Sequence, residues 1–286
     1  MLARLARVVV ASRAVPPTIG LDVGATLCKL AVRGKDLVTE HHPSRDLGPV
    51  RARLEGLAPA RLAATGGGAV GLGAEVAGVR VTHVPEFEAW ARGAPIVAAD
   101  EGVVLPDRYL LVSLGTGTSV LSVDDGQVSR VGGTALGGGT VLGLGRLLLG
   151  AESFRAIAEL ASQGDRRRVD LLVGDVYREV APAIAADLTA SSFAKLASTR
   201  PEDVAHALMG LVGENVALIC GGLARGARID AVVYCGSTLA GNRALRTILE
   251  DITTRFGNRP LFLARGAFCG AVGAAAVAHG SDAGTI

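Results

Sequence analysis

The sequence has few aromatic residues and almost no excess of either charge. Aromatic side chains make up 3% of the 286 residues, and the formal net charge is +2. A nucleic-acid-binding surface is expected to show a stripe of basic residues with interleaved aromatics. The arginines of this chain are scattered and form no such stripe. We therefore expect no nucleic-acid partner.

Long apolar runs are scarce as well, although 49% of the residues are hydrophobic. Glycine, threonine and arginine interrupt every stretch that approaches the roughly 18 apolar residues of a membrane-spanning helix. The sequence therefore predicts no transmembrane segment and no membrane partner.

The cysteines are few and have no metal-binding spacing. None of Cys28, Cys220, Cys235 and Cys269 belongs to a CxxC pair or has a histidine at ligand spacing. Disulfides and zinc are disfavoured by this pattern, and four buried free thiols in a reducing compartment are expected. This indicates the cytoplasm.

The first 17 residues differ from the rest of the chain. Three arginines alternate with apolar residues, but there is no sustained apolar core with a cleavage site, and two prolines end the segment. The composition predicts a disordered extension, or a start codon placed too early.

Two strand-turn-strand units dominate the rest of the chain. TIGLDVGATLCKLAVRGKDLV, from Thr18, has two strand-length apolar runs around a glycine turn, and RYLLVSLGTGTSVLSVDDGQV, from Arg108, repeats this plan. Strands that alternate with helical patterns predict an α/β fold with a duplicated core. With no Pro- or Ser-rich linker between them, we expect packed lobes at 18–105 and 106–265 and a terminal helix at 266–280 that closes the core.

The turns of these two units are suited to phosphate. DVGATLCK (22–29) places a carboxylate at a strand end before a glycine turn, and LGTGTS (114–119) offers two glycines and three hydroxyls. Magnesium prefers hard oxygen ligands, and unobstructed backbone amides can approach phosphate oxygens. Neither GxxxxGK[ST] nor a GxGxxG after the first strand occurs, which disfavours P-loop and Rossmann proteins. Taken alone, each turn is equally consistent with an ordinary hairpin.

Four further features are candidates. Glu86 follows a strand and Pro85, where a carboxylate can accept a proton from a substrate hydroxyl, although acidic residues also suit a solvated first helical turn. Arg130 could hold a carboxylate through two parallel hydrogen bonds. Ser237 lies in CGSTLAGN, which is either a nucleotide-side turn or a helix start capped by Ser237 or Thr238. Residues 132–145, GGTALGGGTVLGLG, hold seven glycines and no charge, which lets backbone approach a ligand.

Several stretches together resemble one family. They are DVGATLCK, ATGGGA, PEFEA, LGTGTS, RVGGTALGGG, GDVYREVAPAIAADLTASSF, CGSTLAGN and GAFCGAVGA. In this order they resemble the type II pantothenate kinases of the actin-like, hexokinase-like ATPase superfamily, over roughly residues 18 to 278. The resemblance implies a two-lobed actin-like ATPase, with a duplicated ribonuclease H-like core and the nucleotide in the cleft between the lobes.

The resemblance also implies an activity and a set of roles. ATP would phosphorylate the primary hydroxyl of pantothenate to give 4'-phosphopantothenate, the first step of coenzyme A biosynthesis, in a homodimeric enzyme. Glu86 matches the catalytic base, Arg130 the arginine near the pantothenate carboxylate, and Asp22 the magnesium region, with contact through water. The positions that match ATP contacts are Gly24, Ala25, Thr26, Leu27, Cys28, Lys29, Thr116, Gly138, Gly139, Thr140, Val141, Leu142, Phe154 and Ser237.

Some positions depart from the family pattern. Ala25 replaces a second glycine in the first phosphate turn, and Phe154 replaces a tyrosine. Cys235 and residues 239–241 differ from the bulkier polar pattern expected near the nucleotide. Two alternatives therefore stay open, namely a kinase acting on a pantothenate-like amide or a sugar, and a catalytically silent ATP-binding protein.

Overall fold

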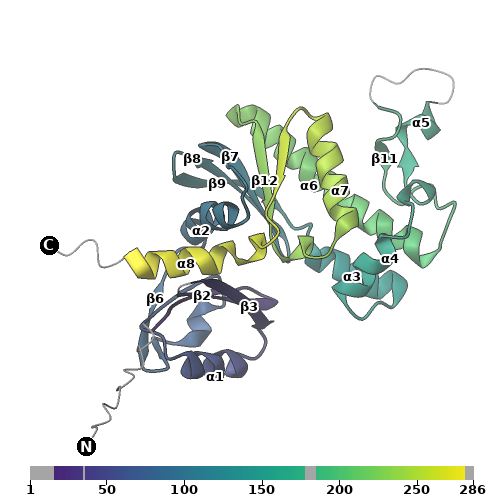
Figure 1. The fold of residues 1–286 in the computed structure, drawn as a ribbon. Coiled ribbons are helices and arrows are strands. Elements are labelled where there is room, and N and C mark those ends of the chain that lie inside the picture. The colour runs from purple at the N-terminus through teal and green to yellow at the C-terminus, as the bar shows by residue number, and fades with distance from the viewer. Residues whose placement is uncertain (1–15, 35, 178–184, 281–286) are drawn as a thin grey trace, which may run out of the picture.

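The computed structural model describes residues 16–34, 36–177 and 185–280, which form two β-sheets with helices between and around them (Figure 1). The expected disordered extension at 1–17 lies, apart from its last two residues, outside the described residues.

The first sheet contains six strands in the order β3-β2-β1-β4-β6-β5. These are β1 (Thr18–Val23), β2 (Leu27–Arg33), β3 (Leu37–Pro43), β4 (Arg61–Thr65), β5 (Glu75–Val76) and β6 (Val79–His83). β1, β2 and β3 pair antiparallel, whereas β1 with β4 and β4 with β6 pair parallel. The predicted hairpin that begins at Thr18 is confirmed.

The second sheet contains five strands in the order β13-β12-β7-β8-β9. These are β7 (Arg108–Leu114), β8 (Thr118–Asp124), β9 (Gln127–Thr134), β12 (Ala231–Cys235) and β13 (Arg259–Phe262). β7, β8 and β9 pair antiparallel, and β12 pairs parallel with both β7 and β13. This repeats the β3-β2-β1-β4-β6 arrangement strand for strand, so the predicted duplication of the core is confirmed.

The longer helices follow the strands as expected, with one break. They are α1 (Gly48–Leu57), α2 (Glu86–Asp100), α3 (Gly138–Leu149), α4 (Phe154–Ala161), α6 (Pro201–Ala227), α7 (Arg243–Arg255) and α8 (Cys269–Gly280). The helical pattern expected after the glycine tract is interrupted between α3 and α4, because Gly150 adopts a left-handed φ of 62°. Ser153 then caps α4 by accepting a hydrogen bond from the Ala156 N–H.

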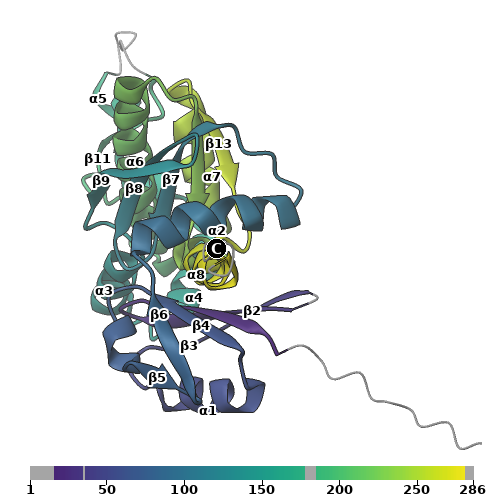
Figure 2. The same cartoon turned by 90° about the vertical axis from the view of Figure 1, so that its left-hand side faces the viewer.

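Helices α2 and α8 lie between the two sheets and cross each other (Figure 2). Each follows the last parallel strand of its repeat, β6 or β13, so the two helices occupy equivalent positions in the duplicated core. Gly93 and Gly273 meet at the crossing. A Cβ on Gly93 would overlap the Cys269 carbonyl oxygen and lie 2.8 Å from the Gly273 nitrogen. Backbone-to-backbone packing at this crossing therefore joins the two lobes.

Helix α8 also covers the first sheet, although it comes last in the sequence. Ala271, Ala274 and Ala275 are fully buried, and a Cβ on Gly20 of β1 would lie 2.5 Å from the Ala275 nitrogen. Small residues on this helix allow that approach, because a longer side chain would push helix and sheet apart.

Helix α6 bears on the expectation that the chain has no transmembrane segment. It is long and apolar enough to cross a membrane by length and composition, with a hydropathy of 1.6 over its most apolar window. However, 67% of that window is buried inside the protein, where α3, α4 and α7 pack against it. We therefore interpret α6 as a core helix.

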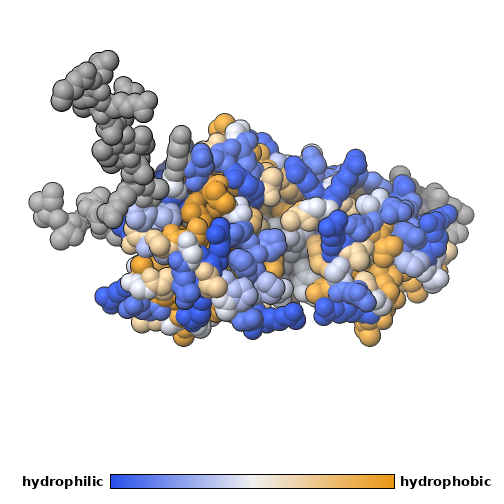
Figure 3. Space-filling view, turned by 60° about the horizontal axis from the view of Figure 1, so that its bottom comes forward, coloured by the Kyte–Doolittle hydropathy of each residue, from blue (hydrophilic) through white to orange (hydrophobic). Residues whose placement is uncertain are grey.

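The surface of the protein is mixed in character. On the face shown in Figure 3, hydrophilic and hydrophobic residues alternate.

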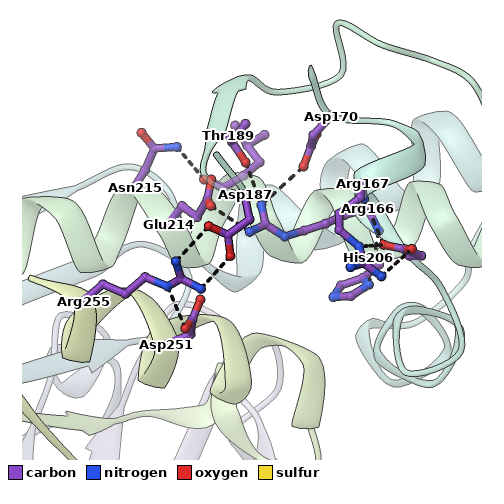
Figure 4. Close-up of polar contacts among 12 residues, drawn as sticks. Arg166, Arg167, Asp170, Asp187, Thr189, His206, Glu214, Asn215, Asp251 and Arg255 are labelled. Atoms are coloured by element: carbon purple, nitrogen blue, oxygen red, sulfur yellow. Dashed lines mark hydrogen bonds and ion pairs between the residues drawn. The ribbon is translucent and has the colours of Figure 1, made fainter. Parts of the chain in front are cut away.

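A buried ionic cluster anchors the segment between α4 and α6, which includes α5 (Val173–Val176) and the short strands β10 (Leu171–Leu172) and β11 (Thr189–Ser191). The Arg166 guanidinium donates to Glu214 at 2.7 Å, to Thr189 at 2.9 Å and to Asp170 at 3.4 Å (Figure 4). The ADLTASSF motif is thus fixed to α6 by charge-assisted hydrogen bonds.

Candidate active site

A cavity of about 720 Å³ lies where the β1–β2 turn faces the β7–β8 turn. The start of α2, the end of β9, the first turns of α3 and α4 and the segment after β12 complete its walls. Both halves of the duplicated core therefore contribute their strand-to-strand turns to one site.

A hydrogen bond joins the two turns across the cavity. Thr26 Oγ1 and Thr116 Oγ1 are 3.2 Å apart, although 90 residues separate them in the sequence. Both side chains are exposed to the cavity, so their hydroxyls are available to a ligand as well as to each other.

The β7–β8 turn is held by backbone and hydroxyl groups of the second lobe. The Gly115 carbonyl accepts from the Gly138 N–H at 2.8 Å and from Thr238 Oγ1 at 2.8 Å. The Gly139 N–H donates to the Thr116 carbonyl at 2.9 Å. Because a Cβ on Gly138 would lie 2.5 Å from Thr238 Oγ1, this position has no room for a side chain. The glycine tract therefore packs against the turn as well as lining the cavity.

Asp22 and Lys29 form an ion pair at the inner wall. Lys29 Nζ donates to Asp22 Oδ2 at 3.2 Å, and the two side chains are 12% and 4% exposed. Burial raises the pKa of Asp22, and Lys29 opposes that rise. This buried carboxylate and its lysine thus form part of the wall of the cavity that Thr26 and Thr116 also line.

Glu86 is the first residue of α2 and lies on the same cavity wall. Its side chain still reaches solvent, but the surrounding protein replaces part of its hydration shell, which raises the pKa of Glu86. The nearby Asp22 carboxylate raises this pKa further, while Lys29 lowers it. A carboxylate with a raised pKa is a better proton acceptor than an ordinary glutamate.

Arg130 approaches from β9. Its side chain is exposed and lines the cavity, and a Cβ on Gly133 would lie 2.7 Å from one of its terminal nitrogens. The absence of a side chain at Gly133 therefore leaves space for the guanidinium above this strand.

The structure brings most of the proposed site residues to the cavity, and three lie away from its walls. Gly24, Ala25, Thr26, Leu27, Lys29, Thr116, Gly138, Gly139, Leu142, Phe154 and Ser237 line it, together with Asp22, Glu86 and Arg130. Cys28 points to the opposite face of β2 and is fully buried, because successive strand residues alternate. Val141 faces the core from α3. The Thr140 hydroxyl donates to the Ala135 carbonyl.

The capping alternative for CGSTLAGN is wrong. Helix α7 begins at Arg243, and its cap is Asn242, whose side chain accepts from the Leu245 N–H at 3.2 Å. Ser237 and Thr238 belong to a separate short 3₁₀ turn, and both line the cavity.

Sequence reasoning missed two residues of the cavity wall, Trp90 and Ser113. The other wall residues without an assigned role lie in motifs that were already candidates, namely Gly115, Gly117, Thr118 and Ser119 in LGTGTS, Gly133, Thr134 and Ala135 in the glycine tract and Thr238 in CGSTLAGN. Ser113 directly precedes LGTGTS, so that motif could have been extended by one residue. Trp90 had a separate signal, since it lies four residues after Glu86 in a predicted helix and therefore on the same helical face.

Comparisons with known proteins identify the family. The model of the Fumble family matches residues 51–277. The chain belongs to the Fumble family. Among relatives, the type II pantothenate kinase of Staphylococcus haemolyticus (strain JCSC1435) is 34% identical over 264 residues, which cover 90% of this chain and 98% of that protein. The type II pantothenate kinase of Staphylococcus aureus (strain USA300) is 34% identical over 262 residues, covering 90% and 97%.

Solved structures show the fold of this Fumble family member. The activator of 2-hydroxyisocaproyl-CoA dehydratase from Clostridium difficile, with bound ADPNP, matches 94% of this chain and 98% of its own at a TM-score of 0.62 and 16% identity. A ROK family glucokinase from Streptomyces griseus, with glucose and AMPPNP, matches 92% and 99% at a TM-score of 0.60 and 14% identity. The fold is therefore the α/β actin-like ATPase fold with two mixed sheets, as the sequence predicts.

Proposed function

We propose that this protein is an ATP-dependent pantothenate kinase that produces 4'-phosphopantothenate. One observation supports this most directly, namely a single cavity that holds two opposed hydroxyl-rich turns, a carboxylate with a raised pKa and an exposed arginine. The turns suit a triphosphate, the carboxylate a reacting hydroxyl and the arginine an anionic acceptor.

Proton transfer is the task of Glu86. Its carboxylate accepts the proton of the primary hydroxyl as the hydroxyl oxygen forms a bond to the γ-phosphorus. The bond from that phosphorus to the β,γ-bridging oxygen breaks, and ADP leaves with the electron pair. Lys29, the Thr26 and Thr116 hydroxyls and the glycine amides hold the phosphate oxygens, since positioning and charge stabilisation provide most of the catalysis in phosphoryl transfer.

The residues present fit a magnesium ion that is bound mainly through the nucleotide. Among residues 16–34, 36–177 and 185–280, no group of three or more His, Cys, Asp or Glu could hold a metal. Magnesium usually keeps several waters and uses one or two carboxylates together with substrate phosphates, so Asp22 alone is a sufficient protein partner through water. When bound, the ion would neutralise phosphate charge.

Arg130 is the proposed partner of the pantothenate carboxylate. Its guanidinium is exposed at the cavity, and a planar fork of N–H groups matches a carboxylate in two parallel hydrogen bonds. A neutral analogue should therefore lose about 1.5 to 3 kcal/mol of transition-state binding, the usual range for hydrogen bonds to a charged group, because it cannot accept these bonds as a carboxylate does.

The decisive experiment compares two glutamates of one helical turn. Glu88 pairs with Arg92 at 3.0 Å on the outer surface of α2, so Glu88→Gln is a matched control for Glu86→Gln. We expect Glu86→Gln to reduce kcat by at least about a hundredfold, the usual contribution of general base catalysis, while Glu88→Gln retains wild-type rates. Wild-type turnover by Glu86→Gln would remove this residue from its role.

A substrate panel decides between acceptors. kcat/KM should be highest for pantothenate among pantothenate, a pantothenate-like amide without the carboxylate and a sugar. Preference for the amide or the sugar would replace the pantothenate proposal. Ala25 and Phe154 motivate the other alternative, a catalytically silent ATP-binding protein. That alternative replaces the kinase proposal if calorimetry shows ATP binding but no alcohol is phosphorylated.

The remaining expectations belong to the same proposal. We propose a homodimer, as the family resemblance implies, and exposed apolar side chains such as Leu147, which is 79% exposed, and Leu148, which is 51% exposed, are candidates for its interface. Cytoplasmic location is supported by four cysteines that are all free and buried. The lobe limits 18–105 and 106–265, with the closing segment 266–280, are proposed on the division between the two sheets.

A further inference from the structure

Trp90 is the single tryptophan of the chain, and it lines the catalytic cavity. It lies four residues after Glu86 in α2, so the two side chains leave the helix on the same face. Its ring is 5% exposed and packs within the core cluster that includes Ala31 and Cys269. The ring position is therefore fixed by the protein.

The indole N–H of Trp90 lies near the Asp22 carboxylate. A Cβ on Gly270 would lie 3.0 Å from Trp90 Nε1 and 2.8 Å from Asp22 Oδ2, so both atoms border the same point. A side chain at Gly270 would separate them. The tryptophan therefore lies in the cavity wall to which Asp22 and Glu86 also belong, and Arg130 enters the same cavity from β9.

This donor has no acceptor within the described part of the protein. Trp90 Nε1 makes no hydrogen bond to any residue of 16–34, 36–177 or 185–280, and it is not among the unpaired atoms that are sealed from solvent. Buried tryptophan N–H groups usually have a partner. An unused donor on a residue that lines the same cavity as the proposed base indicates a ligand acceptor there.

We propose that Trp90 is a specificity-determining residue whose N–H donates to the acceptor oxygen adjacent to the hydroxyl that is phosphorylated. This inference rests on the proposed function. In pantothenate the oxygen is the secondary hydroxyl, on the carbon between the dimethyl carbon and the amide. With the carboxylate at Arg130, this bond holds the other end of the substrate and directs the primary hydroxyl at Glu86.

The test pairs a protein change with a substrate change. Trp90→Phe keeps an aromatic ring but removes the donor together with part of the indole, and a pantothenate analogue with a methylene at the secondary alcohol removes only the acceptor. We expect Trp90→Phe to raise KM for pantothenate on the order of tenfold, as for the loss of one hydrogen bond, and to leave KM for ATP unchanged. With the analogue, wild type and Trp90→Phe should have equal KM.

Val97→Ala is the matched control for loss of packing. Val97 is 1% exposed in the same helix and lies in the same core cluster, but it does not line the cavity. Val97→Ala should lower Tm without changing the ratio of KM for pantothenate to KM for ATP. An unchanged KM for pantothenate in Trp90→Phe, or the same rise with the analogue, would overturn the proposal.

Fluorescence separates this inference from the proposed function. Because the chain has one tryptophan, its emission reports on this wall alone. Pantothenate added without ATP should change the emission of the wild type, and calorimetry should show weaker pantothenate binding by Trp90→Phe. If these results hold but no phosphate is transferred, the proposed function fails and the role of Trp90 stands. If calorimetry shows that pantothenate binds but the emission does not change, the proposed role of Trp90 is wrong. If pantothenate does not bind, the role of Trp90 and the proposed function are both wrong.

Discussion

Substitution of Gly93 by alanine tests whether the crossing of α2 and α8 holds the lobes in register. The added methyl group would overlap the Cys269 carbonyl oxygen and lie 2.7 Å from the Cys269 carbonyl carbon. Both neighbours are backbone atoms, which cannot rotate away as a side chain can. To reach the 3.5 Å or more at which non-bonded atoms pack, the helices must move apart by roughly 1.5 Å.

The expected loss of unfolding free energy depends on how far the two helices are displaced. Overpacking of a core typically costs about 1 to 3 kcal/mol, and we expect the upper end because the obstacle is backbone. With roughly 2 to 4 °C of Tm per kcal/mol for a chain of this size, Tm should fall by about 6 to 12 °C. Since Glu86 begins α2 and Asp22 lies against Gly270 of α8, kcat/KM should also fall, by about a hundredfold for a displacement of about 1 Å.

Gly222→Ala is the control for the chemical change itself. Gly222 lies in α6, and an added Cβ would have no neighbour within 4 Å. Alanine should therefore stabilise this helix by about 1 kcal/mol and raise Tm slightly. Differential scanning calorimetry and steady-state kinetics measure both effects. A Gly93→Ala protein with the Tm and kcat/KM of the wild type would refute the packing argument.

Four other predictions rest on single contacts. Because the pKa of Glu86 is raised, its base form is lost as the pH falls through a value above 4.5, the ordinary glutamic acid pKa, so the acid limb of the kcat/KM profile should lie above that value and disappear in Glu86→Gln. Gly133→Ala should raise KM for pantothenate about tenfold or more, because the added methyl group would lie 2.7 Å from an Arg130 terminal nitrogen, and it should also lower Tm, because the methyl group would lie 2.6 Å from the Thr118 carbonyl oxygen. Ala25→Gly should lower KM for ATP by removing a methyl group from the first phosphate turn, and equal values would show that the methyl group does not contact the nucleotide. Asn242→Ala should destabilise the protein by about 0.5 to 2 kcal/mol in urea denaturation, through loss of the α7 cap.

The sequence predicted the fold well because its signals are local. Hairpins with glycine turns, buried parallel strands and periodic helices each appear within about twenty residues, and their repetition in the order of β1 and β7 indicated a duplicated core. The positions of Asp22 and Glu86 could be anticipated for the same reason, since Asp22 lies near the end of β1 and Glu86 begins α2 shortly after β6.

The remaining features depend on contacts between distant segments. Nothing near Thr26 in the sequence indicates that it hydrogen-bonds Thr116, and nothing near Gly93 indicates a second helix against its backbone. The direction of side chains within a motif was also out of reach. Cys28 lies between two cavity residues but faces the core, and the registry of β2 decides this.

Helix α8 covers the first sheet but is synthesised last, so this sheet stays partly uncovered during translation. Thr18 of β1 is among the first described residues made, whereas Cys269, which begins the helix that covers this strand, comes about 250 residues later. At roughly 5 to 20 residues per second, about 12 to 50 s pass before the cover can arrive. During this time the buried face of β1 and the small residues that receive α8 have no native partner. The first lobe, although first to be made, is therefore completed no earlier than the second.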